Sequence, residues 1–234
     1  MIYGLIICAG KQTRYACSVP KSLAMLDDTT TILDINIKNM SKYSDVVYIV
    51  CSNENSKYFS NYNNLIVIES GYGSGDAILK VFNKLDIKDG DTCFIQWGDS
   101  LQKDTSVFNK LLNNYNGISL IPCTFEDKPY VQVIQIDNKV KVLFSKFNEQ
   151  VSSGYHDLSI FYCNANDLLK YLNEWRDNNF IDGHYCHKHS NEFEFLDVFN
   201  DTDIRATVLN IENYNDFSFN TVEQFNKLKE SLNV

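Results

Sequence analysis

The sequence predicts an α/β protein, a three-layer α/β/α sandwich of helices around a mixed, mostly parallel central sheet. Short β-branched and aromatic runs alternate along the chain with longer segments of helical period, which is typical of this class. The first run, residues 3–8, is apolar throughout, as expected for a parallel strand that is covered on both faces. The chain is 44% hydrophobic and 22% charged, which is typical of a globular protein and excludes a disordered one.

The first half of the chain has the most regular alternation. Strands are expected at 3–8, 46–51, 65–68, 92–97 and 118–123. Helices are expected at 31–40, 54–60, 76–85 and 106–115. A strand followed by a helix and another strand favours parallel pairing through a crossover connection.

The pattern changes after Pro129. Two alternating runs flank residues 137–139 and predict a β-hairpin. The remaining elements are expected to be a strand at 158–163, a helix at 165–175, a polar stretch at 176–191, a helical segment at 193–199, a strand at 207–211 and a helix at 221–232. No linker-like segment separates the part of the chain before Pro129 from the part after it, and 234 residues suit one domain. We therefore expect a single domain, 1–234, whose halves are 1–125 and 126–234.

Charge and cysteine usage narrow the class of protein. The 21 basic and 30 acidic residues give a net charge of −9, and the lysines are scattered, so nucleic acid is not an expected partner. No apolar run approaches the roughly 18 residues of a membrane span, so a membrane is not expected either. Seven cysteines without a CxxC pair are typical of small buried side chains in a reducing compartment, which predicts a cytoplasmic protein.

The loop after the first strand is the most informative segment. Open α/β sheets bind ligands at the carboxyl ends of their strands, and Ala9 and Gly10 allow backbone N–H groups to approach a phosphate closely. Arg14 and Lys21 add two cations in the same loop, and Pro20 stiffens the approach to the second. These features predict a polyphosphate site, whereas an ordinary solvated loop is the alternative.

The pairs Ala9-Gly10, Thr13-Arg14 and Pro20-Lys21 resemble, in order and spacing, the signature of the nucleotidyltransferases that activate phosphorylated sugars and alcohols. Gln12 stands where that family usually has Gly. The resemblance implies a Rossmann-like, GT-A-like fold in which 1–125 binds the nucleotide and 126–234 binds the acceptor. It also implies catalytic roles for Arg14 and Lys21 and nucleotide contacts from Cys8, Ala9, Gly10 and Lys11.

The same resemblance implies roles for two later segments. The glycine-rich turn at 69–77 opens a helix, and in the family it holds the base and ribose, which implies nucleotide contacts from Gly73, Ser74 and Asp76; a purely structural turn is the alternative. Asp99 follows a strand and Gly98, and a carboxylate there suits Mg²⁺ that bridges phosphate oxygens. Asn220 precedes the last helix and is implied as the second Mg²⁺ ligand, with Asp216 as an acidic substitute.

The acceptor residues are implied less directly. Lys146 follows the hairpin, where relatives carry a lysine that contacts the acceptor's phosphate, and Glu194 and Asp197 share a helical face that either contacts the acceptor or is solvated. His184, His187 and His189 lack partners at the spacing of a tetrahedral zinc site. We therefore expect a polar lid there rather than a metal site.

The predicted reaction is transfer of a nucleoside monophosphate from a nucleoside triphosphate to a phosphorylated small molecule, with Mg²⁺ as cofactor and release of pyrophosphate. The chain resembles stand-alone cytidylyltransferases for phosphocholine, or for phosphoglutamine in bacterial capsule synthesis, so CTP is favoured. Hexose- or heptose-1-phosphate activation with another triphosphate is the alternative. Two further alternatives remain. Gln12 and Asn220 would suit a nucleotide-binding module that has lost catalysis. The turn at 71–75 by itself would suit a dinucleotide- or S-adenosylmethionine-binding enzyme. The oligomeric state stays open, a homodimer included.

Overall fold

The computed structural model describes residues 1–10, 19–69, 71–147, 149–187, 191–212, 214, 217–219 and 221–232. The longer strands are β1 (Ile2–Ile7), β2 (Val46–Ser52), β3 (Leu65–Ile68), β4 (Thr92–Trp97), β6 (Ser119–Glu126), β7 (Val131–Ile136), β8 (Lys139–Phe144), β9 (Gly154–Asp157), β10 (Ile160–Asn164) and β13 (Ala206–Asn210). The two-residue strands are β5 (Ser100–Leu101), β11 (Phe180–Ile181), β12 (His184–Tyr185) and β14 (Phe217–Ser218).

The helices of the described residues lie between these strands. The α-helices are α1 (Ile32–Met40), α2 (Ser74–Phe82), α3 (Ser106–Asn114), α4 (Ala165–Asn179), α5 (Asp197–Asp201) and α6 (Val222–Leu232). Three 3₁₀ turns are η1 (Lys21–Leu23), η2 (Ser56–Phe59) and η3 (Ser145–Phe147). None of these helices is both long and apolar enough to span a membrane.

One mixed sheet connects both halves of the described chain. Its strand order is β3-β2-β1-β4-β10-β6-β9-β7-β8, and β13 also pairs with β6. The pairs β1–β2, β1–β4, β2–β3 and β6–β13 are parallel, whereas β10 is antiparallel to β4 and to β6. The predicted α/β class is confirmed. The strand that separates β4 from β6 comes from the second half of the sequence.

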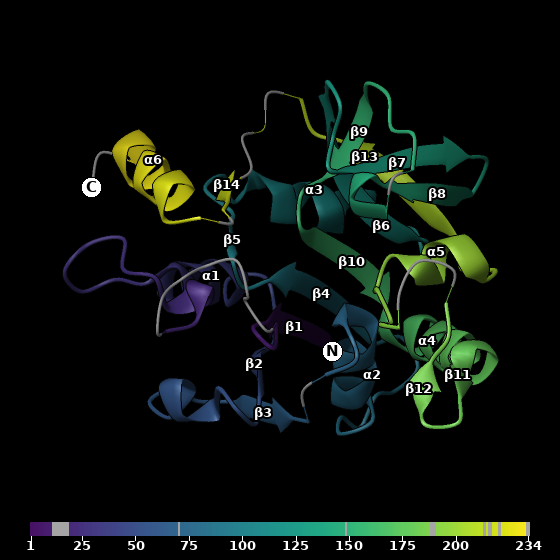
Figure 1. Cartoon of the computed structure of the whole chain (residues 1–234), viewed down its shortest axis with the longest axis horizontal. Coiled ribbons are helices and arrows are strands. Elements are labelled where there is room, and N and C mark those ends of the chain that lie inside the picture. The colour runs from purple at the N-terminus through teal and green to yellow at the C-terminus, as the bar shows by residue number, and fades with distance from the viewer. Residues whose placement is uncertain are drawn as a thin grey trace.

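Helices cover both faces of the sheet, which explains why the first strand is apolar on both sides (Figure 1). On one face α2, α4 and α5 contribute to a core centred on Ile78, Leu172 and Phe199. On the other face α1 and α3 contribute Leu33 and Phe108 to a second core. Strand residues alternate between the two cores, as a strand of period two requires.

A third, smaller core fixes the last helix. It contains Ala24, Leu26 and Ile32 from the region before and within α1, and Phe225 and Leu228 from α6. In Figure 1, α6 and β14 lie at the end of the molecule that also holds α1 and β5. Strand β14 pairs with β5 in antiparallel register. The chain therefore returns, after β13, to the carboxyl end of β4.

The strand order creates a crevice at one place in the sheet. From β1 the chain moves to β2 and β3 on one side, and then crosses to β4 on the other side of β1. In open α/β sheets ligands bind at this kind of reversal, outside the carboxyl ends of the strands. The described residues that follow β1 and β4 therefore lie at the same end of the sheet.

Two expected helices differ from the structure. Residues 54–60 form only the short turn η2, and 193–199 are helical only from Asp197 onward in α5. Phe193 instead continues as irregular chain beside the start of α2, where its N–H donates to Tyr72 O at 2.7 Å and its carbonyl accepts from Gly75 N at 2.8 Å. These tertiary hydrogen bonds outweigh the helical spacing of the apolar residues in that segment.

Candidate active site

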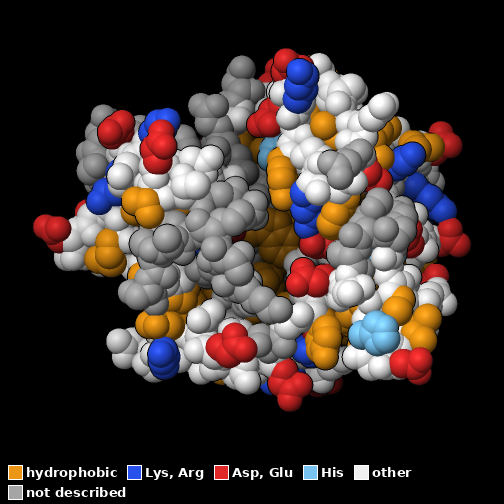
Figure 2. Space-filling model, in the orientation of Figure 1, with side chains coloured by type: hydrophobic (Ala, Val, Ile, Leu, Met, Phe, Trp, Pro, Cys, Tyr) orange, Lys and Arg blue, Asp and Glu red, His pale blue; other side chains and the backbone are white. Residues whose placement is uncertain are grey.

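A cavity of about 440 Å³ opens at the crevice between β1, β3 and β4. It is lined by nine of the residues for which the resemblance implies a role: Cys8, Ala9, Gly10, Lys21, Gly73, Ser74, Asp76, Asp99 and Glu194. A hollow with a hydrophobic floor and charged side chains on its rim is visible in the middle of the molecule in Figure 2. Residues from four separate parts of the sequence therefore meet at one site.

Lys21 and Asp99 form the polar centre of this cavity. The Lys21 Nζ lies 3.1 Å from Asp99 Oδ2, and it also donates to Phe219 O at 3.1 Å. Lys21 is 4% exposed, whereas 42% of the Asp99 side chain is accessible. The lysine is thus held in place by protein groups, and the carboxylate of Asp99 still faces solvent.

Local structure explains this geometry. Lys21 begins η1 directly after Pro20, and proline fixes the backbone φ angle that leads into such a turn. Asp99 follows β4 and Gly98, whose N–H donates to Ile7 O at 2.9 Å. A Cβ atom at position 98 would lie 2.4 Å from Cys8 Sγ. Only glycine therefore allows the ends of β1 and β4 to approach so closely.

Cys8 contributes its backbone and its bulk rather than a reactive thiol. Its side chain is 3% exposed, and burial raises the pKa of the Cys8 thiol to about 12, although a hydrogen bond with Ser22 lowers it in part. A thiol with such a pKa stays neutral at physiological pH and is a poor nucleophile. This cysteine is a lining residue of the cavity.

The glycine-rich turn forms the opposite wall through contacts with residues 193–195. Ser74 Oγ accepts from Phe195 N at 2.9 Å and donates to Glu194 Oε2 at 3.3 Å. A Cβ atom on Gly75 would lie 2.5 Å from the Phe193 ring. The small residues of this turn therefore allow residues 193–195 to approach it closely. This contact supports a structural role for the turn, and the turn also lines the cavity.

Asp76 is in the cavity wall, but other protein groups already bind its carboxylate. Lys80 Nζ lies 2.8 Å from Asp76 Oδ2, and Tyr185 OH donates to Asp76 Oδ1 at 2.8 Å. Burial, with the neighbouring Asp76 as a smaller cause, raises the pKa of the Tyr185 hydroxyl. Tyr185 therefore remains a hydrogen-bond donor, and the contact ties β12 to α2.

Lys146 and Glu194 form an ion pair at the rim of the cavity. Glu194 lines the cavity, whereas Lys146 belongs to η3 and reaches Glu194 from outside. The Lys146 ammonium also lies 4.7 Å from the centre of the Phe147 ring. Two of the residues implied in acceptor binding are thus in direct contact.

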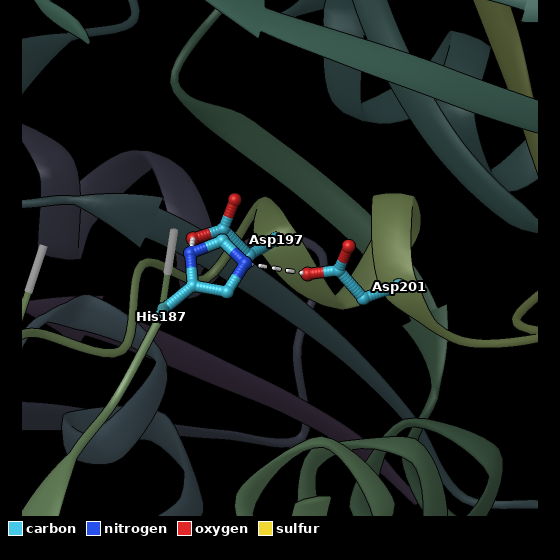
Figure 3. A group of neighbouring side chains, drawn as sticks. All are labelled: His187, Asp197 and Asp201. Atoms are coloured by element: carbon cyan, nitrogen blue, oxygen red, sulfur yellow. Dashed lines mark hydrogen bonds and ion pairs between the residues drawn. The ribbon is translucent and has the colours of Figure 1, made fainter. Parts of the chain in front are cut away.

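Asp197 lies away from the cavity-lining residues, in a cluster with His187 and Asp201 (Figure 3). It is 0% exposed, so a solvated helix face is wrong for this residue. His187 Nδ1 lies 3.5 Å from Asp197 Oδ2, and His187 Nε2 lies 3.0 Å from Asp201 Oδ2. Asp201 also accepts from the Trp175 indole at 2.9 Å. Each ring nitrogen of His187 faces a different carboxylate of α5, and the Trp175 indole joins Asp201 to α4.

Several residues of the sequence analysis, Lys11, Gln12, Arg14, His189, Asp216 and Asn220, lie outside the described residues. The residue before Asn220 is described, because the carbonyl of Phe219 binds Lys21. The cavity is also lined by residues for which no role was expected, among them Ser22, Glu69, Trp97 and Glu192. Trp97 and Glu69 could have been found because they end, or directly follow, the strands β4 and β3.

The residues around Asp99 fit a hard divalent cation. The cavity holds an accessible carboxylate oxygen at the end of β4, and Mg²⁺ is commonly bound through one or two carboxylates together with substrate phosphates and water. The nearby ammonium of Lys21 shares one oxygen of that carboxylate. The donor set is therefore suited to an ion that takes most of its ligands from a bound polyphosphate.

No protein-family model matches the chain. Solved structures do. The CTP:phosphocholine cytidylyltransferase LicC of Streptococcus pneumoniae has a TM-score of 0.70 at 12% identity over 99% of both chains. The chain shares the nucleotidyltransferase fold. A candidate glucose-1-phosphate thymidylyltransferase of Bacillus anthracis has a TM-score of 0.74 at 13% identity over 99% of this chain and 95% of that one. The inositol-1-phosphate CTP transferase of T. maritima has a TM-score of 0.72 at 14% identity over 99% of this chain and 94% of that one.

Proposed function

We propose that the protein is a nucleotidyltransferase that transfers a nucleoside monophosphate from a nucleoside triphosphate to the phosphate of a small acceptor and releases pyrophosphate. One observation carries this proposal: Lys21 Nζ lies 3.1 Å from Asp99 Oδ2 in a cavity at the ends of β1 and β4. A cation and a carboxylate at that place suit a reaction in which two anions must be held together.

In the proposed reaction an oxygen of the acceptor phosphate attacks the α-phosphorus. The new O–P bond forms as the bond between the α-phosphorus and the bridging oxygen breaks, and pyrophosphate leaves with the electron pair. A phosphate monoester is already an anion near neutral pH, so the attacking oxygen needs no general base. The protein's task is alignment and charge neutralisation.

Each cationic group has a place in this proposal. Lys21 is held rigidly by Asp99 and Phe219, so its ammonium needs little reorganisation to bind the α-phosphate and the incoming phosphate. Arg14 is proposed to bind the β- and γ-phosphates. Mg²⁺, when bound by Asp99 and Asn220, would neutralise charge on the phosphate oxygens.

The base and the acceptor class are proposed from the resemblance and the fold. LicC and the T. maritima protein are named as CTP-dependent enzymes, whereas the B. anthracis protein is named for thymidylyl transfer. We propose CTP as the nucleotide, with a hexose- or heptose-1-phosphate and another triphosphate as the alternative. A phosphocholine- or phosphoglutamine-type acceptor, used in bacterial capsule synthesis, is the favoured candidate. The proposed setting is the cytoplasm.

The test is a matrix of CTP, UTP, GTP and dTTP against phosphorylated amino alcohols, polyols and sugars, read as pyrophosphate release with Mg²⁺ and with EDTA. We expect release with CTP and at least one acceptor, and none with EDTA. Thermal stabilisation by a triphosphate without release in any well would instead support a binding module without catalysis. Activity with UTP or dTTP and none with CTP would overturn the proposed base while leaving the reaction class intact.

A further inference from the structure

A short strap, residues 180–187, follows α4 and reaches the wall of the cavity. It contains β11 and β12, which pair with one another beside α4 (Figure 1). Near the end of the strap the Tyr185 hydroxyl donates to Asp76 Oδ1 at 2.8 Å, and Asp76 lines the cavity. The backbone N–H of Cys186 donates to the carbonyl of Asn179, the last residue of α4, at 2.8 Å. Whatever holds the end of the strap therefore also helps to hold one wall of the cavity.

His187 ends the strap and lies against two helices (Figure 3). Its side chain is only 6% exposed. Its Nε2 lies 3.0 Å from Asp201 Oδ2, its Nδ1 lies 3.5 Å from Asp197 Oδ2, and both carboxylates belong to α5. From α4 the Trp175 indole packs beside the imidazole, with the ring centres 5.2 Å apart. The side chain of His187 is thus enclosed between two acids and an aromatic ring.

The charges on the neighbouring elements leave these two carboxylates to His187. Among the described residues, its ion pairs are those with Asp197 and Asp201. On α4 the nearest basic residue in the sequence, Arg176, pairs with Asp177 at 2.7 Å. On the strap itself, the Tyr185 hydroxyl is directed to Asp76 on α2.

The protonation state of His187 decides how many of these contacts are favourable. A neutral imidazole has one N–H, so it can donate to one carboxylate and turns a lone pair toward the other, whereas the imidazolium donates from both nitrogens. Asp197 is fully buried, and a buried carboxylate is costly unless a cation or hydrogen-bond donors compensate it. The electron-rich face of an indole also attracts a cation. The surroundings of His187 therefore favour its charged form.

We propose that His187 is a proton-operated latch, which fastens the end of the strap to α5 as the imidazolium and releases it when the proton is lost. The stability that the latch contributes is complete below about pH 6.5, where an unperturbed histidine is half protonated, and it is lost as the pH rises past the point at which the folded chain gives up the proton. The latch does not depend on the proposed reaction. Its opening would weaken the support that Tyr185 gives to Asp76 in the cavity wall.

The NMR signals of the imidazole test the charge directly. In the full chain, with His187 assigned through its bonded atoms, we expect imidazolium signals to persist at about pH 8, where an unperturbed histidine is almost entirely neutral. Asp201→Asn should lower the pH at which the proton leaves, because the amide still accepts from the Trp175 indole but removes one negative charge. A neutral His187 at about pH 7, or a titration that Asp201→Asn does not move, would overturn the proposal.

Hydrogen exchange at the Cys186 amide tests the latch's effect on the strap. The rate is corrected for the pH dependence of an unstructured chain, so that it reports opening of the bond to Asn179. We expect protection to fall at least about tenfold over the pH range in which the His187 proton leaves, because a buried ion pair is then broken.

Two variants assign this step to one side chain. His187→Gln, which is neutral at every pH, should show low protection without the step. His184→Gln changes an exposed histidine of the same strap and should keep the step. Protection at Cys186 that is unaffected by the loss of the proton, or an equal step in His187→Gln, would show that His187 does not hold the strap.

Discussion

Lys21 shows what a single buried charge contributes to the candidate site. Among the described residues its Nζ binds Asp99 Oδ2 and Phe219 O, and its stem is enclosed by protein. A buried ammonium is costly unless it is paired. The pairing of Lys21 therefore fixes its position before any substrate arrives, which is the condition for efficient electrostatic catalysis.

Lys21→Met keeps most of the buried stem and removes only the charged end. We expect the chain to fold, because Asp99 can turn toward solvent, and we expect kcat to fall by about 10²–10³, equivalent to about 3–4 kcal/mol. Circular dichroism checks the fold and pyrophosphate release checks the turnover. The control is Lys88→Met, whose side chain is 73% exposed. Turnover like that of the wild type in Lys21→Met would remove Lys21 from the mechanism.

Asp157 carries a cost that depends on pH. It is 4% exposed, its Oδ1 accepts from Ser159 N at 3.0 Å, and burial raises the pKa of its carboxyl. The folded state therefore binds this proton more tightly than the unfolded state does. The contribution of Asp157 to the free energy of unfolding consequently falls as pH rises, and it is most unfavourable above the pKa of the folded state.

Asp157→Asn should remove that dependence, because the amide oxygen can still accept from Ser159. The stability of the variant relative to the wild type, measured by urea unfolding, should increase as the pH rises above the usual carboxyl pKa and should level off above the raised pKa of the folded state. Asp86→Asn, at a side chain that is 89% exposed, provides the reference. A difference that stays constant with pH for Asp157→Asn contradicts this assignment.

The residues whose positions could be predicted are those that lie close in sequence to the end of a strand. Lys21, Gly10 and Asp99 could be placed in one site because each follows, or lies close after, a strand of a parallel sheet, and such strands end at one edge. Glu192 and the Phe219 carbonyl could not be placed, because their positions depend on where long connections return. The ion pair between Lys146 and Glu194 is likewise a contact between segments 48 residues apart, and neither segment's own pattern specifies the other.

Helix α2 shows how tertiary contacts decide the role of a whole element. Its first turn receives the segment 193–195, through Gly75 N to Phe193 O and through Ser74 Oγ. The predicted helix at 76–85 was placed correctly in kind, but its start lies two residues earlier, at Ser74. The expected helix at 193–199 was wrong for the same reason, because the residues before Asp197 bond to α2 instead of to one another.

Gly75→Ala tests this contact, because two effects of opposite sign compete. Alanine in a helix is normally favourable over glycine by about 0.5–1 kcal/mol, but here its Cβ would lie 2.5 Å from a buried aromatic ring. We expect a net loss of about 1–3 kcal/mol in the free energy of unfolding. Gly10→Ala, where no heavy atom of the described residues lies within 4 Å of the added Cβ, should change stability by less than about 0.5 kcal/mol. A gain in stability for Gly75→Ala would show that α2 and Phe193 separate readily.

At the scale of the molecule the two halves of the sequence share one sheet. Strand β10 lies between β4 and β6, and β13 extends the pairing of β6 on the same sheet. The alternation of strands and helices was enough to predict the α/β class. The position of β10 could not be predicted, because an antiparallel strand in the middle of a sheet differs from its neighbours in no feature of its own sequence and is simply apolar. The single domain, 1–234, stays a prediction.

That prediction has a direct test in cooperativity. We expect one unfolding transition whose midpoint is the same by circular dichroism and by tryptophan fluorescence, because residues of both halves share one core. A fragment of residues 1–125 should not fold, since β4 and β6 are not neighbours without β10. Two separated transitions, or a folded fragment with dispersed amide signals, would establish two units instead of one.

The hydrogen bond from Lys21 Nζ to Phe219 O joins positions 198 residues apart. During synthesis, the amino-terminal strands emerge from the ribosome long before the partner that completes the lysine's coordination. A growing chain would therefore lack this contact until residue 219 has left the ribosome, and a bulky insertion that pulled the segment around Phe219 away would leave the Lys21 ammonium without one of its oxygen partners.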